Sequence, residues 1–95
     1  MMITVHVRYF NFLAVVADAR QAEITIPADT TLRQFIHHLA EMHSERFRSF
    51  IFDGQEISTY LRIFHNEKLI WEVQLDDIRL AEGDEIMLFP AIAGG

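Results

Sequence analysis

The chain contains no cysteine among its 95 residues. This absence excludes disulfides, a cysteine nucleophile and thiolate metal sites. Basic residues are also few, because eight Lys and Arg stand against 14 Asp and Glu and leave a formal net charge of −6 at pH 7. Nucleic-acid affinity depends on neutralising phosphates with basic side chains, so we expect no direct nucleic-acid partner. Any sulfur or acyl chemistry has to use the carboxyl end of the chain.

Long apolar runs are missing as well. No run approaches the roughly 18 residues of a membrane span. The first eight residues lack the basic start and apolar stretch of a signal peptide. We therefore expect a cytoplasmic protein with no membrane partner. The nucleophile-elbow, P-loop and dinucleotide-binding glycine motifs are absent too, and 95 residues make one domain without room for a separate catalytic domain.

What the chain does have is an unusual end. Residues 91–95 read Ala-Ile-Ala-Gly-Gly and follow Pro90. Glycine has no Cβ and little preference for ordered backbone, so Gly94-Gly95 predicts a flexible, narrow arm that can enter a tunnel. The alternative is a frayed end that happens to finish in glycines. Pro90 cannot extend a central ladder, so we expect residues 1–90 to form the domain and residues 91–95 the arm.

The hydrophobic pattern predicts one confident helix among several strands. Thr31 and Gln34 form a capping-box pattern, and five apolar residues follow at helical spacing: Leu32, Phe35, Ile36, Leu39 and Met42. The first half is expected to form a strand over 3–10, a short helix or turn over 12–20, a strand over 22–26 and the helix over 32–43, followed by an irregular segment over 44–59. The second half is expected to form a strand over 60–66 with a short hairpin partner over 68–71. A turn-rich crossing over 75–80 and a turn at 83–84 then lead to a last strand over 85–89.

This order suggests an α+β fold, with a mixed sheet of four to five strands and one main helix packed across it. The helix is expected to pack on a sheet face built from Ile3, Val5, Val7, Ile63, Ile86 and Leu88. If the first and last strands lie side by side and parallel, the fold is the ubiquitin-like β-grasp.

Histidines and carboxylates offer two further candidate sites, and both have a simpler interpretation. His37, His38 and His43 do not share one helix face as metal ligands would, and His65 occupies the apolar register of its strand, typical of a hydrogen-bonded histidine at the core edge. We expect no metal site. The carboxylates form either a solvated acidic loop or, alternatively, a general acid/base pair; they are Asp76, Asp77, Glu82, Asp84 and Glu85.

Aromatic placement near the chain end predicts an interface. If Ile86 and Leu88 face the core, then Met87 and Phe89 face outward. Phe10 falls on the same side of the first strand, so neighbouring strands would bring the three together. Such an apolar patch is typical of a protein interface, and here it would lie at the root of the arm.

The ending EGDEIMLFPAIAGG resembles the G-D-E-V-x-x-F-P-P-V-x-G-G close of the MoaD/ThiS family of ubiquitin-like sulfur carriers. The opening ITVHVRYFNFL, the PADTTLRQFI helix start and the LRIFHNEKLI strand match in order and spacing. The resemblance implies a β-grasp carrier, not an enzyme alone, whose Gly95 carboxylate is adenylated and then thiocarboxylated, with Gly94 giving access. It also implies partner contacts at the interface positions of the family, here Phe10, Leu69 and Phe89, joined by Met87 and the arm residues Pro90, Ala91, Ile92 and Ala93.

The resemblance implies partners rather than bound cofactors. ATP is used by an adenylyltransferase of the MoeB or ThiF type, which resembles ubiquitin-activating enzyme. The implied sulfur acceptor is a large subunit of molybdopterin synthase of the MoaE type, or another sulfur acceptor enzyme. The leading hypothesis is therefore the small subunit of molybdopterin synthase in molybdenum or tungsten cofactor biosynthesis. The chain departs from the motif at Pro90-Ala91-Ile92, and its ending also resembles the cysteine-synthesis carrier CysO. Carriers for thiamin, cysteine or tRNA thiolation, a ubiquitin-like modifier and an inert binding domain therefore stay open.

Overall fold

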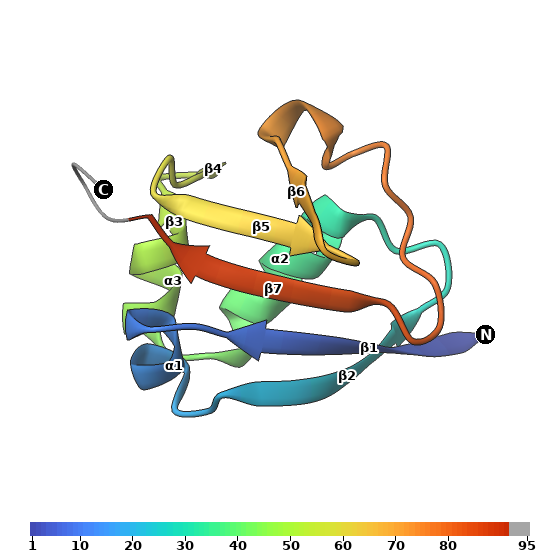
Figure 1. Ribbon diagram of the computed structural model, residues 1–95, viewed down its shortest axis with the longest axis horizontal. Helices are drawn as coiled ribbons and strands as arrows, with labels where there is room; N and C mark the ends of the chain where they lie inside the picture. The colour runs from blue at the N-terminus through green and yellow to red at the C-terminus, as the bar shows by residue number, and fades with distance from the viewer. Residues whose placement is uncertain (92–95) are drawn as a thin grey trace.

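A computed structural model describes residues 1–91, in which helices pack against one face of a five-stranded sheet (Figure 1). The strand order is β2-β1-β7-β5-β6, with bounds Gln21–Pro27, Met2–Tyr9, Glu85–Pro90, Leu61–His65 and Lys68–Ile70. β1 and β7 are parallel neighbours at the centre, while the other pairs are antiparallel. The predicted β-grasp is confirmed.

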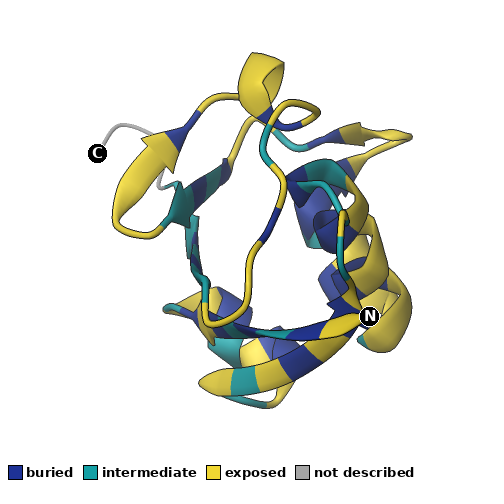
Figure 2. Cartoon of the chain, turned by 90° about the vertical axis from the view of Figure 1, so that its right-hand side faces the viewer, coloured by how far each residue is buried: buried dark blue, intermediate teal, exposed yellow. Residues whose placement is uncertain are grey.

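The core lies between the sheet and helix α2 (Leu32–Met42). In α2, the Thr31 hydroxyl accepts a hydrogen bond from the Gln34 N–H (3.2 Å), and the Gln34 carboxamide oxygen accepts one from the Thr31 N–H (2.9 Å). This confirms the capping box, which satisfies two N–H groups that a helix start leaves free. Figure 2 shows the buried residues facing the interior, and they include every core residue predicted from the pattern: Ile3, Val5, Val7, Leu32, Phe35, Ile36, Leu39, Ile63, Ile86 and Leu88.

One residue of the predicted helical stripe does not join the core. Met42 is 49% exposed, since α2 ends at this residue and His43 is its C-cap. The predicted buried face therefore covers Leu32 to Leu39, about two turns of α2, and does not extend to Met42 in the last turn.

The segment over 44–59, expected to be irregular, contains a helix and a small hairpin. Helix α3 spans Glu45–Ile51, and the Ser44 hydroxyl caps it by accepting a hydrogen bond from the Phe47 N–H (3.2 Å). β3 (Phe52–Asp53) and β4 (Glu56–Ile57) then pair around a turn. The prediction was wrong because seven residues are too few to show a helical period, although Ser44 at the N-cap was a usable signal.

The remaining connections are short. Helix α1 (Phe12–Ala17) joins β1 to β2, as the pattern allowed. Asn66 and Glu67, with φ of 49° and 73°, make the turn between β5 and β6, where two positive φ angles suit the twist of a hairpin. A 3-10 turn, η1 (Glu72–Gln74), begins the crossing to β7. None of the helices in the described part of the chain combines the length and apolar character needed to cross a bilayer.

Candidate docking surface

The outer face of the sheet, turned away from the helices, carries a cluster of large apolar side chains. It comprises Phe10, Phe64, Leu69, Met87 and Phe89, and we call it the aromatic face. Strand pairing sets Phe64 opposite both Met87 on β7 and Leu69 on β6, so the cluster crosses three strands. The register predicted for Phe10, Met87 and Phe89 is confirmed. Met87 and Phe89 alternate with the buried Ile86 and Leu88, and Phe10 follows the buried Tyr9 and stacks on Phe89.

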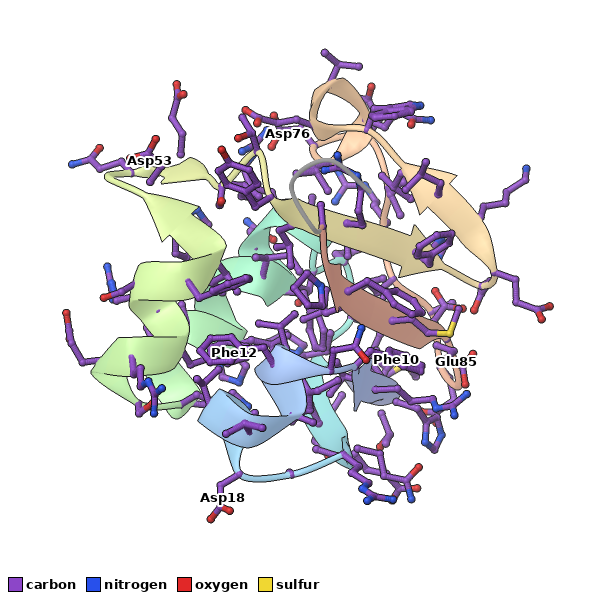
Figure 3. The ribbon with its side chains drawn as sticks, turned by 60° about the vertical axis from the view of Figure 1, so that its left-hand side comes forward. Phe10, Phe12, Asp18, Asp53, Asp76 and Glu85 are labelled. Atoms are coloured by element: carbon purple, nitrogen blue, oxygen red, sulfur yellow. The ribbon has the colours of Figure 1, made fainter. Side chains whose placement is uncertain are left out.

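Ring packing organises this face. The Phe10 and Phe89 rings stack with centroids 4.0 Å apart and planes 8° from parallel (Figure 3 shows Phe10 beside β7). Phe64 meets Phe89 edge to face at 5.3 Å. The rings are only half-buried, and Leu69 remains 36% exposed. Exposed clusters of this kind are typical of protein interfaces, in keeping with the prediction made from the sequence.

Sequence reasoning missed Phe64, which completes the aromatic face. The signal was available, because Leu61, Ile63 and His65 were assigned to the inner register and alternation then puts Phe64 outside. The docking role of the whole face stays a prediction.

The last described residues, Pro90 and Ala91, directly follow Phe89. Pro90 ends β7 opposite Leu61, and the Ala91 N–H donates to the Tyr60 carbonyl at 2.6 Å. The Pro90 nitrogen points to the β1 side, beyond the final β1 pair of Tyr9 with Leu88, so the missing N–H removes no ladder hydrogen bond. The sites predicted at Ile92, Ala93, Gly94 and Gly95 lie outside the described residues.

A polar network closes the opposite end of β7. The Asp84 carboxylate accepts hydrogen bonds from His65 Nε2 (2.8 Å), Asn66 Nδ2 (3.0 Å) and the Ala81 N–H (2.9 Å). Burial by itself would raise the pKa of Asp84, but these three hydrogen bonds lower the pKa below its ordinary value. His65 is thus a satisfied histidine at the core edge, as its strand register predicted.

The other acidic loop residues have solvated or structural positions. Asp76 forms an ion pair with Arg33 (2.8 Å), and Glu82 accepts a hydrogen bond from the Thr4 N–H (3.0 Å). Asp77 is exposed, and Glu85 is half-buried. Within residues 1–91, the acidic side chains are therefore either solvated or bonded to neighbouring parts of the domain.

The helical histidines are dispersed. His37 and His38 are exposed on α2, whereas His43 shares a 2.6 Å hydrogen bond with the Tyr9 hydroxyl. Burial lowers the pKa of His43 and raises the pKa of Tyr9. In the part of the chain that the structure describes, no three His, Asp or Glu side chains are grouped to hold a metal ion.

Parallel central strands, a helix across one face and an apolar outer face define a ubiquitin-like β-grasp domain. Comparison with known proteins refines this class. The sequence model of the ThiS family matches residues 7–95, and the chain belongs to this family of ubiquitin-like sulfur carriers.

Individual relatives agree with that membership. The chain is 27% identical over 94 residues to the molybdopterin synthase sulfur carrier subunit of Drosophila melanogaster, covering 99% of this chain and 93% of the relative. Small archaeal modifier protein 1 of Haloferax volcanii superposes with a TM-score of 0.81 at 25% identity, covering 97% and 99% of the two chains. The protein of that name from Methanosarcina acetivorans gives a TM-score of 0.83 at 19% identity, covering 100% and 99%, a likeness of fold alone.

Proposed function

We propose that the chain is a sulfur carrier whose Gly95 carboxyl group is activated and thiocarboxylated by a partner enzyme. One observation supports this above the others: the strand that leads toward Gly94-Gly95 has two side chains, Met87 and Phe89, on the aromatic face. A partner that docks on this face would receive the arm at the same time. Specificity then resides mainly in the folded domain, while Gly94 and Gly95 provide only backbone groups and the reacting carboxyl.

The chemistry follows from the poor reactivity of a carboxylate. Attack on the ionised group would place a second negative charge on it, so the carboxylate oxygen first attacks the α-phosphorus of ATP and releases pyrophosphate. A persulfide sulfur on a partner then attacks the acyl carbon and expels AMP, which gives an acyl disulfide. A second thiol reduces the disulfide bond and leaves the thiocarboxylate. With no cysteine in the chain, the sulfur is held at the carboxyl end alone.

The pathway we propose is molybdenum or tungsten cofactor biosynthesis. The chain would act as the small subunit of a molybdopterin synthase and give sulfur to a cyclic pyranopterin, bound by a large subunit of the MoaE type. An adenylyltransferase of the MoeB or ThiF type would supply ATP-dependent activation. Support comes from the Drosophila melanogaster relative, which matches almost end to end and whose name states this role.

Intact-mass measurement tests the proposal. The chain is coexpressed with its adenylyltransferase and a sulfurtransferase, and thiocarboxylate formation adds about 16 Da, the exchange of one oxygen for one sulfur. The thiocarboxylated chain is then mixed with the MoaE-type subunit and the pyranopterin precursor. The pathway is supported if the mass of the carrier returns to its starting value and the dithiolene forms at the same time. If no cognate adenylyltransferase catalyses ATP–pyrophosphate exchange with the chain, the carrier function is wrong.

A protein-modifying role is the second candidate. The Haloferax volcanii relative is named a small archaeal modifier protein, and it matches 97% of this chain. In that role the activated Gly95 carbonyl would form an isopeptide bond with a lysine of another protein. Enrichment of Gly95-linked lysine peptides from cells would support it, and a Gly95 thiocarboxylate without such peptides would favour the carrier.

A further inference from the structure

A groove runs beside the aromatic face, between helix α1 and the adjoining ends of β1 and β2. Its volume is about 810 Å³, and its polar lining includes Arg8, Asn11, Asp18 and Arg20. We call it the α1 groove. Arg8 pairs with Met87 across the central strands, so the groove and the aromatic face share an edge.

The α1 groove is cationic in a chain of net charge −6. Arg8 and Arg20 are its cations, and Asp18 is the one carboxylate of the described lining. Both arginines are free for a partner, because within residues 1–91 Arg33 is the one arginine that forms an ion pair. The Arg8 guanidinium lies 5.2 Å from the centroid of the Phe10 ring, an arrangement that holds this charge against the aromatic face without neutralising it.

The charge reverses along the same strands. A second groove continues past Arg8 toward His6, Glu23 and Glu85, and His6 Nδ1 lies 3.3 Å from a Glu23 carboxylate oxygen. Since β1 and β7 are parallel, Arg8 lies toward the end of β7 that leads to the arm, and Glu85 lies at its start. Charge is thus unevenly distributed along these strands: the end near the arm is positive, and the end away from it is negative.

We propose that the α1 groove binds an acidic segment of the activating adenylyltransferase, next to the apolar contact on the aromatic face. Guanidinium groups bind carboxylates through paired hydrogen bonds, which fix direction as well as position. The charge reversal then favours one orientation of the carrier, with the arm toward the acidic segment. This proposal rests on the carrier function proposed above and adds the chemistry of the surface that the carrier recognises.

Charge complementarity of this type acts chiefly on the association rate. The test measures association and dissociation of the chain with its cognate adenylyltransferase by stopped-flow fluorescence at several salt concentrations. Arg20→Glu is the main variant, because Arg20 has no ring contact that could disturb the aromatic face. We expect association about tenfold slower at low salt, a smaller change in dissociation, and convergence with the unmodified chain as salt screens the charges.

Two further variants sharpen the test. Asp18→Asn removes the one carboxylate of the groove and should speed association about two- to threefold. Asp18 has φ of 55°, a conformation that asparagine also tolerates, so this variant should fold. Arg79→Glu is the matched control: it makes the same change in net charge at an exposed position near the start of α2, where Arg79 Nη1 donates to the Asp29 carbonyl. We expect little change in its association rate.

The outcomes separate the two proposals. Equal slowing by Arg79→Glu and Arg20→Glu would mean that net charge governs association, and the groove would be excluded. If the unmodified chain gains sulfur while Arg20→Glu and Asp18→Asn associate at its rate, the groove proposal is wrong and the carrier function stands. If the unmodified chain neither binds the enzyme nor gains sulfur, the carrier function is wrong and the groove proposal with it.

Discussion

Replacing Leu69 tests the aromatic face with little interference from folding. Leu69 lies on the edge strand β6 opposite Phe64 and is 36% exposed. By contrast, Phe89 packs on two rings, each pair worth about 0.5–1.5 kcal/mol, so its substitution would also destabilise the fold. Leu69 is therefore the better probe of partner binding.

The expected magnitude follows from the exposed fraction. Full burial of a leucine side chain is worth about 1.5–3 kcal/mol, and docking can bury only the third or so that is still exposed. Leu69→Ala should weaken binding by about 0.5–1 kcal/mol, a two- to fivefold rise in Kd. Leu69→Glu places a carboxylate in an apolar contact and should weaken binding by at least about 2 kcal/mol, roughly 30-fold. Both variants should change the free energy of unfolding by less than about 1 kcal/mol.

Isothermal titration against the adenylyltransferase gives Kd, and urea unfolding gives the stability. Val73→Glu is the control, because Val73 is an apolar residue 85% exposed on η1, outside the aromatic face. A folded Leu69→Glu variant that binds as tightly as the unmodified chain would refute the docking role of this face. Equal weakening by Val73→Glu would point to a nonspecific effect of added charge.

Other substitutions separate the arm, the core and the polar network. Deleting Gly95, or Gly94→Val, should abolish thiocarboxylate formation in the mass assay and leave Tm nearly unchanged, because neither glycine contributes a side chain to the core; sulfur gain by either variant would contradict the arm prediction. Leu39→Ala should lower the free energy of unfolding by about 2–5 kcal/mol in urea titrations, since Leu39 is 0% exposed, and a loss under about 1 kcal/mol would contradict tight packing of α2 on the sheet. The lowered pKa of Asp84 means that its stabilising effect is complete above the ordinary value of 3.8 and is lost as pH falls through the folded-state pKa. Asp84→Asn should therefore be less stable than the unmodified chain at pH 7 and converge with it in acid; a stability difference independent of pH would exclude the carboxylate charge as the cause.

Local pattern was sufficient for most of the secondary structure and for the inner face of the sheet. Alternation along β1 and β7 predicted which side chains enter the core, and the capping box at Thr31 and Gln34 located the start of α2. These features depend on residues close in the chain, where a period of two or 3.6 residues is directly visible. Helix α3 was missed because seven residues make only about two turns, too few for the helical period to be visible in the sequence.

The candidate site depended on contacts between distant segments. The sequence places Phe10, Phe64 and Phe89 on outward positions of their strands, but only the order β1-β7-β5 brings the three rings together. The Asp84 network and the α1 groove arise in the same way, because each joins residues from separate elements. Hydrophobic periodicity determines which face a side chain occupies, whereas strand order determines its neighbours, and strand order is set by the packing of the whole core.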